Sequence, residues 1–373
     1  MPGSSWSPVG GHEQIARSEA GGTPRLPIIE TAGRVPQRRS AVRPTPLRCA
    51  APERVASITV RVITDLSTSP WPGERSVVTI GAYDGVHRGH QAVIAEVQRR
   101  AAAQGARSVV LTFDRHPASI VRPESAPKLL TDLDQKLELL EATGVDATVL
   151  VEFDAEQSRE EPQDFVTRVL VECLKVAAIV VGDDFHFGRG RGGNVALLRE
   201  IGAAHDFEVH PLQLVQRDDG PEEALSSTAI RRAMAGGQVE LAAEMLGHPF
   251  EARGIVVKGD QRGRLLGFPT ANVEVPNAIC LPSDGVYAGW YVRPDGSHHA
   301  CAMNLGRRPT FYEHADHSLL EAHLIDFADD LYGERGRVQF THFLRSERKF
   351  DGIDAIKSQL KSDIEHARVM LGL

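Results

Sequence analysis

Two histidines follow an apolar stretch that has the composition of a buried strand. Residues 77–81 are mostly β-branched, which is typical of a central strand in a parallel sheet. His87 and His90 come next, at the start of a helix predicted over residues 89–100. The first turn of a helix has free backbone N–H groups and a positive dipole end, which favour anions. Because Gly89 lets a phosphate approach the backbone, the pattern predicts a phosphate site rather than two surface histidines.

A second set of phosphate ligands stands at the predicted start of a later helix. Ser226, Ser227 and Thr228 place three hydroxyls there, which either cap the helix or bind a phosphate. Arg231, in the next turn, has a guanidinium that forms forked bonds with phosphate oxygens. Alone, this segment indicates a helix cap, but with the upstream histidines it favours phosphate binding.

The third chemical signal is a glycine-rich segment. Gly259, Gly263 and Gly267 lie in a predicted turn whose backbone amides can approach a nucleotide phosphate. Thr270 and Asn272 follow and offer neutral oxygens that suit Mg²⁺, which keeps several waters and takes few protein ligands. The sequence contains no G-x-x-x-x-G-K-[ST] motif, so it excludes a P-loop kinase.

Alternating strands and helices are predicted to position the histidine segment and the hydroxyl segment. Strands are predicted over residues 77–81, 108–112, 147–151, 177–182 and 207–214, and helices over 89–100, 162–173 and 194–205. Thr131 and Asp134 have the spacing of a capping box at the start of a further helix. The alternation indicates an α/β fold with a doubly wound parallel sheet, whose ligands bind at the carboxyl ends of the strands. Asp84, Asp114 and the two histidines are expected to cluster there.

A different pattern begins near residue 250. Strands without long helices between them are predicted over residues 250–258, 286–293, 300–305, 319–325 and 337–344. They indicate a small antiparallel β-barrel. A C-terminal packing helix follows, with one apolar face formed by Ile353, Ile356, Leu360, Ile364 and Ala367. We expect four segments: an extension (1–57), an α/β domain (58–235), a linker helix (236–248) and a barrel domain (249–373).

Composition limits the class of protein. The 373 residues are 42% hydrophobic and carry a net charge of −8, which argues against a nucleic-acid partner. No run of ~18 apolar residues predicts a membrane span. Four cysteines without a C-x-x-C pair suggest free thiols in the cytoplasm. Residues 1–57, with eight arginines and four glutamates, indicate a disordered tail or translated sequence upstream of the true start.

The motifs of the α/β domain carry a family resemblance. Gly81-x-x-Asp84-Gly85 followed by His87-x-Gly89-His90 resembles the HxGH signature of nucleotidyltransferases. Its longer form is similar to the bacterial bifunctional riboflavin kinase/FMN adenylyltransferase family, also called FAD synthetase. Residues 226–231 resemble the ISSTxIR motif of the same superfamily. Another segment resembles the family's GxDFxFG motif, which is associated with the flavin side of the adenylylation site, and contributes Asp184, Phe185 and Phe187.

The barrel motifs continue the resemblance. Residues 259–272, including Phe268-Pro269-Thr270-Ala271-Asn272, are similar to the riboflavin kinase signature. The segments Asn304-x-Gly306-x-x-Pro309-Thr310-Phe311 and Glu321-x-His323-x-x-Asp326-Phe327 extend it. The resemblance implies that Glu321 is the general base of the kinase, and that His87 and His90 stabilise charge during adenylyl transfer.

The resemblance also implies two consecutive reactions on small molecules. ATP would phosphorylate riboflavin to FMN in the barrel, and a second ATP would adenylylate FMN to FAD and pyrophosphate in the α/β domain. Mg²⁺ is implied as the metal for both steps, with Thr270 and Asn272 as its ligands in the barrel. No nucleic acid or membrane partner is expected, and association of copies of the chain is left open.

Three other readings remain open on sequence. Residues 188–193 match G-x-G-x-x-G, the pattern of dinucleotide oxidoreductases, although residues 183–187 separate them from the strand. The chain could be another small-molecule adenylyl- or cytidylyltransferase, or a non-catalytic flavin sensor.

The four histidines at positions 298, 299, 314 and 317 form no complete metal-ligand set. Arg115, where the family commonly has proline, and Ala82-Tyr83 depart from the family pattern.

Overall fold

The computed structural model describes residues 61–213, 225–307 and 318–373, which belong to one compact unit, Val55–Leu373. The predicted extension over residues 1–57 lies outside the described residues. Cys49, His314 and His317 lie outside them too, as do Pro309, Thr310 and Phe311 of the second barrel motif.

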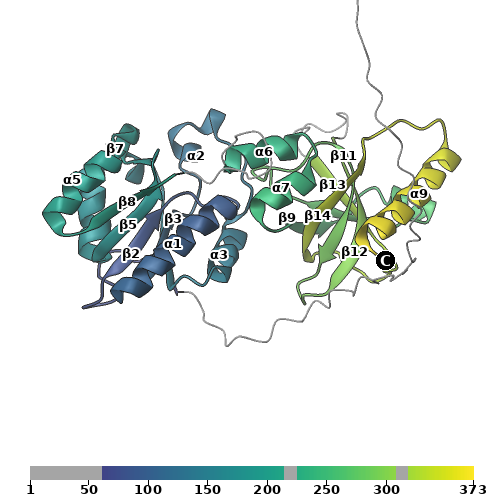
Figure 1. The fold of residues 1–373 in the computed structure, drawn as a ribbon. Helices are drawn as coiled ribbons and strands as arrows, with labels where there is room; N and C mark the ends of the chain where they lie inside the picture. The colour runs from purple at the N-terminus through teal and green to yellow at the C-terminus, as the bar shows by residue number, and fades with distance from the viewer. Residues whose placement is uncertain (1–60, 214–224, 308–317) are drawn as a thin grey trace, which may run out of the picture. The chain divides into compact units, whose positions relative to one another are not determined.

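Six parallel strands form the sheet of the first domain, in the order β1-β4-β3-β2-β5-β8 (Figure 1). The strands are β1 (Arg61–Ile63), β2 (Ser76–Ile80), β3 (Arg107–Phe113), β4 (Ala147–Val151), β5 (Val176–Gly182) and β8 (Glu208–Leu212). From β2 the chain adds β3 and β4 on one side, then crosses to β5 and β8 on the other. The carboxyl end of β2 is therefore a switch point of the sheet, where α/β proteins bind ligands.

Helices cover both faces of this sheet. They are α1 (Arg88–Gln104), α2 (Ala118–Val121), α3 (Leu133–Ala142), α4 (Pro162–Phe165), the π-helical η3 (Val166–Cys173) and α5 (Val195–His205). Along β2, Val77 packs with Val97 of α1, whereas its neighbour Val78 packs with Val169 of η3. Because successive side chains of a strand point to opposite faces, every residue of β2 is buried. The predicted doubly wound fold is confirmed.

Several short elements connect these strands and helices. They are η1 (Pro123–Ser125), η2 (Gln157–Arg159), η4 (Arg189–Arg191), and the antiparallel pair β6 (His186–Phe187) and β7 (Gly193–Asn194).

The second domain is a closed antiparallel barrel with the strand order β10-β13-β12-β11-β14-β9, as predicted. Its strands are β9 (Phe250–Val257), β10 (Ala271–Glu274), β11 (Gly285–Val292), β12 (His298–Arg307), β13 (Ser318–Leu324) and β14 (Arg335–Arg345). Tyr287, Tyr291 and Phe340 are fully buried inside it. The C-terminal helix α9 (Ile353–Leu371) packs on the barrel (Figure 1). Ala367 of α9 belongs to the same apolar cluster as Ala288 and Ala300 of the barrel.

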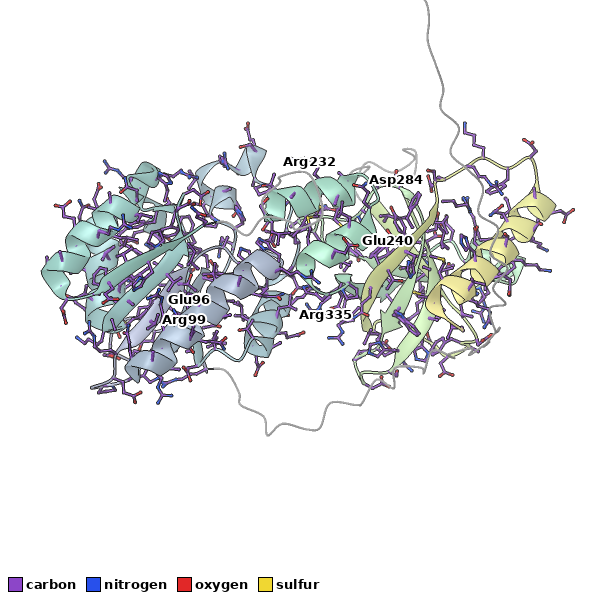
Figure 2. All side chains as sticks on the ribbon, viewed as in Figure 1. Glu96, Arg99, Arg232, Glu240, Asp284 and Arg335 are labelled. Carbon is purple, nitrogen blue, oxygen red and sulfur yellow. The ribbon has the colours of Figure 1, made fainter. Side chains whose placement is uncertain are left out.

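Two helices between the domains share the barrel's core. They are α6 (Ser227–Ala235) and α7 (Val239–Leu246). Ile230, Met234 and Leu246 belong to the same apolar cluster as Phe250 and Tyr287. Glu240 of α7, labelled in Figure 2, accepts a hydrogen bond of 3.0 Å from the backbone N–H of Phe343 on β14. The predicted linker helix is thus packed against the barrel.

The structure corrects three local predictions. Asp132, not Thr131, caps α3, because its side chain accepts from the backbone N–H of Gln135. The predicted glycine-rich turn contains a short helix, α8 (Arg262–Leu266), because Gly263 adopts a helical conformation and only Gly267, which ends the helix, has a positive φ. On α9, Ile353 is 61% exposed because it begins the helix, before the face that packs on the barrel.

Candidate active sites

The turn after β2 delivers both histidines to the first turn of α1. Tyr83 and Val86 adopt positive φ angles of 50° and 39°, which side chains rarely tolerate outside functional turns. His87 caps α1, and its Nδ1 accepts a bond of 3.3 Å from the backbone N–H of His90. The two imidazole rings stack with their centroids 3.6 Å apart. A Cβ on Gly89 would lie 3.1 Å from the His87 ring, so glycine permits this stacking.

Both imidazoles are neutral at pH 7. Burial, and then the positive charge of Arg231, lower the pKa of His87 to about 4. Burial, and then His87, hold the pKa of His90 well below its ordinary value. The Nδ1 atom of His90 is buried and has no hydrogen-bond partner among the described residues. Neutral imidazoles interact with a phosphate by donating N–H bonds, and an arriving phosphate would favour their protonation.

Asp84 ties the histidine turn to two other segments. Its carboxylate accepts bonds from the backbone N–H groups of Leu130 and Thr131, at 2.9 and 3.1 Å. It also forms an ion pair with Arg231 of α6. The backbone carbonyl of Asp84 accepts from the Ser227 hydroxyl at 2.9 Å. The start of α6 is therefore fixed beside the start of α1.

The hydroxyls and the arginine of α6 have different roles in this structure. Ser226 caps the helix by accepting from the N–H of Ala229 at 3.2 Å. Arg231 donates to the carbonyl of Lys128 at 2.6 Å as well as to Asp84. A phosphate bound here would share the Arg231 guanidinium with Asp84.

The end of β3 completes this edge of the sheet. Asp114, which follows β3, lines one small cavity with Asp84 and Thr131. His116 and Lys136 line the same cavity. The sequence reasoning missed Lys136, although its spacing of four residues from Leu140 on an amphipathic helix marks it as facing the core.

The flavin-side residues lie after β5. The rings of Phe185 and Phe187 stack with centroids 5.5 Å apart, and Phe187 also contacts Phe165 of the core. Asp184 is exposed. A Cβ on Gly193 would lie 2.7 Å from the Phe187 ring, so that glycine serves packing in the β6–β7 pair. The glycines of residues 188–193 are therefore not the strand-to-helix turn of a dinucleotide site.

In the barrel, two glycines pack directly on the predicted metal ligands. A Cβ on Gly259 would lie 2.5 Å from the side chain of Asn272. A Cβ on Gly263 would lie 2.4 Å from the carbonyl oxygen of Phe268 and 3.3 Å from the Thr270 hydroxyl. Gly267, with a φ of +89°, ends α8. The glycines therefore bring the chain against the start of β10.

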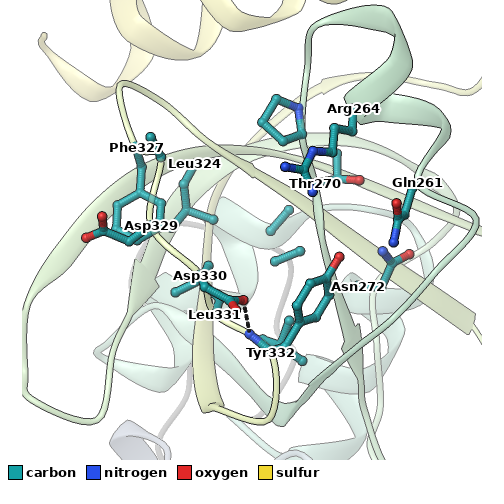
Figure 3. Close-up of a pocket in the computed structure, with 15 residues that line it drawn as sticks. Gln261, Arg264, Thr270, Asn272, Leu324, Phe327, Asp329, Asp330, Leu331 and Tyr332 are labelled. Carbon is teal, nitrogen blue, oxygen red and sulfur yellow. Dashed lines mark hydrogen bonds between the residues drawn. The ribbon is translucent and has the colours of Figure 1, made fainter.

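A cavity of about 380 Å³ opens beside this segment (Figure 3). Its polar lining includes Gln261, Arg264, Thr270, Asn272, Asp329, Asp330 and Tyr332, and Pro269 also borders it. Its apolar wall includes Leu324, Phe327 and Leu331. The sequence reasoning included Phe327 in a family motif but did not single out residues 328–332, because they carry no motif and reach the cavity only through the fold.

The oxygens of this cavity fit a magnesium ion. Asn272 is buried, and its Oδ1 has no hydrogen-bond partner among the described residues. An orphaned buried oxygen is costly unless something binds it. Thr270 lines the same cavity, so two neutral oxygens are available. Within the described residues, no group of three His, Cys, Asp or Glu side chains offers another metal site.

Glu321 lies next to this cavity. On β13 it stands opposite Asn272 of β10 and Asn304 of β12. Its neighbours Leu320 and Ala322 are buried in the barrel, so Glu321 lies on the outer face. Glu321 does not line the cavity itself. Asn272, a predicted metal ligand, both lines the cavity and stands opposite Glu321.

A parallel-sheet domain with an HxGH turn at its switch point, followed by a barrel with a polar cavity beside a glycine-rich segment, defines a two-domain nucleotide-dependent transferase. Residues 70–229 match the FAD synthetase family model, and residues 246–371 match the riboflavin kinase model. The chain belongs to the bifunctional riboflavin kinase/FMN adenylyltransferase family and is an enzyme with these two activities, as predicted.

Known relatives match over most of the chain. The bifunctional riboflavin kinase/FMN adenylyltransferase of Escherichia coli K12 is 37% identical over 314 residues, which cover 84% of this chain and 98% of the relative. The Listeria monocytogenes protein of the same name is 36% identical and covers 81% of this chain and 95% of its own.

A solved structure has the same fold. A crystal structure described as a macrolide-efflux protein from Streptococcus pneumoniae superposes with a TM-score of 0.72 at 29% identity, covering 83% of this chain and 98% of that one. In the described parts of the present chain, the helices are all too short or too polar to cross a membrane.

Proposed function

We propose that each reaction belongs to one domain, with FMN adenylylation in the α/β domain and riboflavin phosphorylation in the barrel. The observation that carries this assignment is that each fold presents its own polar site. One lies at the Asp84–Arg231 ion pair, and the other lies where Gly259 packs on Asn272. We propose residues 58–235 and 249–373 as the two catalytic units, with residues 236–248 joining them.

In the adenylyl-transfer site, an FMN phosphate oxygen would attack the α-phosphorus of ATP, and pyrophosphate would leave. His87 and His90 would donate hydrogen bonds to the nucleotide phosphates as charge develops on them. Gly81 and Gly89, which let the Tyr83 and His87 rings lie close to the backbone, would also let the phosphates approach it. Ser226, Ser227, Thr228 and Arg231 would hold the triphosphate, and Asp84 would fix Arg231 in place.

We propose that the flavin of FMN binds beside the stacked rings of Phe185 and Phe187, with Asp184 as a polar contact. Their position after β5, next to β2 in the sheet, supports this assignment. An aromatic pair at the rim of a site suits a flat, apolar ring system.

In the kinase site, the 5′-hydroxyl of riboflavin would attack the γ-phosphorus of ATP and release ADP. Glu321 would accept the hydroxyl proton as general base. Gly259, Gly263, Gly267 and Pro269 would shape the nucleotide cradle. Thr270 and Asn272 would hold Mg²⁺, which, when bound, neutralises charge on the phosphates. Positioning and charge neutralisation account for both reactions without a covalent intermediate.

The decisive experiment is incubation of the protein with riboflavin, ATP and Mg²⁺, followed by chromatography. We expect FMN first and then FAD, with both lost in EDTA and restored by Mg²⁺. Pantetheine phosphate and choline phosphate should not be adenylylated or cytidylylated. Turnover of either would favour another nucleotidyltransferase, and flavin binding without turnover would favour a sensor.

We also propose that the protein works in the cytoplasm. This rests on the free thiols of Cys173, Cys280 and Cys301, which suit a reducing compartment. Association of copies of the chain stays a prediction for solution measurements.

A further inference from the structure

Lys136 is a buried lysine at the carboxyl edge of the parallel sheet. It lies on α3 and is 7% exposed. Its ammonium donates to the carbonyl of Phe113 at 2.5 Å and to the carbonyl of Ala82 at 3.5 Å. Phe113 is the last residue of β3, and Ala82 begins the turn after β2. One side chain therefore connects the ends of the two strands that lead into the site.

A lysine in this position needs a physical reason. Removing an ammonium from water is costly, and an apolar side chain would fill the same core face without that cost. Burial lowers the pKa of Lys136 to about 8, although the negative charges of Asp84 and Asp114 oppose the shift. The ammonium is thus stabilised by two carbonyls and two nearby carboxylates.

The surrounding charges place Lys136 in the site. It lines the same cavity as Asp84, Asp114, Arg115 and His116. Asp114 is paired with Arg115, and Asp84 is paired with Arg231, so each of these carboxylates also interacts with an arginine. The pKa of His116 is lowered, first by its burial, and the opposing attraction of Asp84 is the next cause.

We propose that Lys136 is a positioning residue for adenylyl transfer, whose ammonium fixes the histidine turn after β2 relative to the Asp114–His116 segment after β3. This inference rests on the proposed assignment of adenylyl transfer to the α/β domain. Protonated Lys136 attracts both carboxylates and holds both carbonyls. Once the amine is neutral, the charge attraction to Asp84 and Asp114 is lost and its hydrogen bonds to the two carbonyls weaken, so the two turns are held together less firmly.

The first test compares Lys136→Met with wild type in the full-length protein. Methionine keeps the length of the side chain but removes its charge. We expect kcat/KM for FMN adenylylation to fall about 10- to 100-fold, the scale of a misplaced catalytic group. Riboflavin phosphorylation by the same protein should stay within about twofold of wild type. Lys361→Met, at an exposed position of α9, is the matched control and should change neither rate.

The second test is the pH profile of kcat/KM for FMN, which reports groups of the free enzyme. Because protonated Lys136 is the active form, wild-type adenylylation should fall as the pH rises through about 8. Lys136→Arg, which stays charged, should keep most of the activity and move this alkaline limb upward by at least about one pH unit. A purely structural role would lower the melting temperature without moving the limb.

The outcomes are separable. Adenylylation by Lys136→Met within about twofold of wild type would overturn the proposal, as would an alkaline limb that is missing in wild type or unchanged in Lys136→Arg. If Lys136→Met fails to fold, the wild-type and Lys136→Arg profiles still decide. Wild type that phosphorylates riboflavin but never forms FAD would instead contradict the proposed function.

Discussion

Asp84 and Arg231 are 147 positions apart in the chain and form a partly buried ion pair between the histidine turn and α6. The Asp84 carboxylate also accepts hydrogen bonds from two backbone N–H groups and from the Thr131 hydroxyl. The geometry of the ion pair therefore reports whether both phosphate-binding segments of the adenylyl-transfer site are in place.

Asp84→Asn should damage both stability and adenylylation. The change leaves the partly buried Arg231 without its counter-charge, and the cost should approach about 3–5 kcal/mol, which is typical of breaking a fully buried pair. Urea unfolding should show a lower free energy of unfolding, and FAD formation from FMN should fall. Asp351→Asn, at an exposed position, is the control and should leave the unfolding midpoint unchanged. A wild-type midpoint in Asp84→Asn would show that the pair contributes little.

The assignment of one reaction to each domain can be tested with Glu321→Gln and His90→Ala. Glutamine keeps the size of Glu321 but cannot accept the riboflavin proton, so FMN formation should fall by about 10²–10⁴-fold. FAD formation from supplied FMN should survive. His90→Ala removes a donor to the nucleotide only at the other site, so FMN should accumulate while little FAD appears. Loss of both activities in either cooperatively folded variant would contradict one reaction per domain.

Acid should destabilise the protein through the buried histidines. The folded-state pKa of His87, about 4, lies below its ordinary value of 6.5, so the unfolded chain binds the proton first. Stability is full above pH 6.5 and is lost as the pH falls towards 4, by about 3 kcal/mol for this group. His87→Gln should flatten this dependence in urea unfolding between pH 7.5 and 4.5. Equal slopes for the variant and wild type would show that carboxylates alone govern acid unfolding.

Gly259→Ala should impair the kinase selectively. The new Cβ would lie 2.5 Å from the buried Asn272 side chain, so the proposed magnesium ligand must move. We expect riboflavin phosphorylation to fall at least about tenfold and to need more Mg²⁺, because misplacing a ligand by about 1 Å has effects of this size. Adenylylation of supplied FMN should persist. Gly236→Ala, whose Cβ would meet only an ordinary contact at 3.5 Å, is the control.

The barrel should need α6 and α7 for full stability. Met234 and Leu246 are buried in its core cluster, and a large apolar side chain contributes about 1.5–3 kcal/mol on burial. A fragment of residues 225–373 should therefore melt well above one of residues 249–373. Both fragments should phosphorylate riboflavin if they fold. Equal melting temperatures would show that the barrel closes its core without these helices.

The order of strands and helices followed from the sequence, because burial imposes a period of two on strands and one apolar face on helices. Turn residues such as Gly85 and Gly89 marked where the histidines would be presented, and Ser226 marked the start of α6. The motifs at residues 81–90 and 259–272 identified the family, since they combine several residue types at fixed spacing.

Only the tertiary structure decided which distant groups meet. Neither the pairing of Asp84 with Arg231 nor the contact of Lys136 with two strand ends has a local pattern, because each depends on how sheet and helices pack. The neutral state of His87 and His90 likewise follows from burial, which the sequence does not state. In the barrel, strand register set Glu321 opposite Asn272, and closure of the barrel brought residues 327–332 to the cavity. Such contacts join segments far apart in the chain, and only the packing of the whole fold determines them.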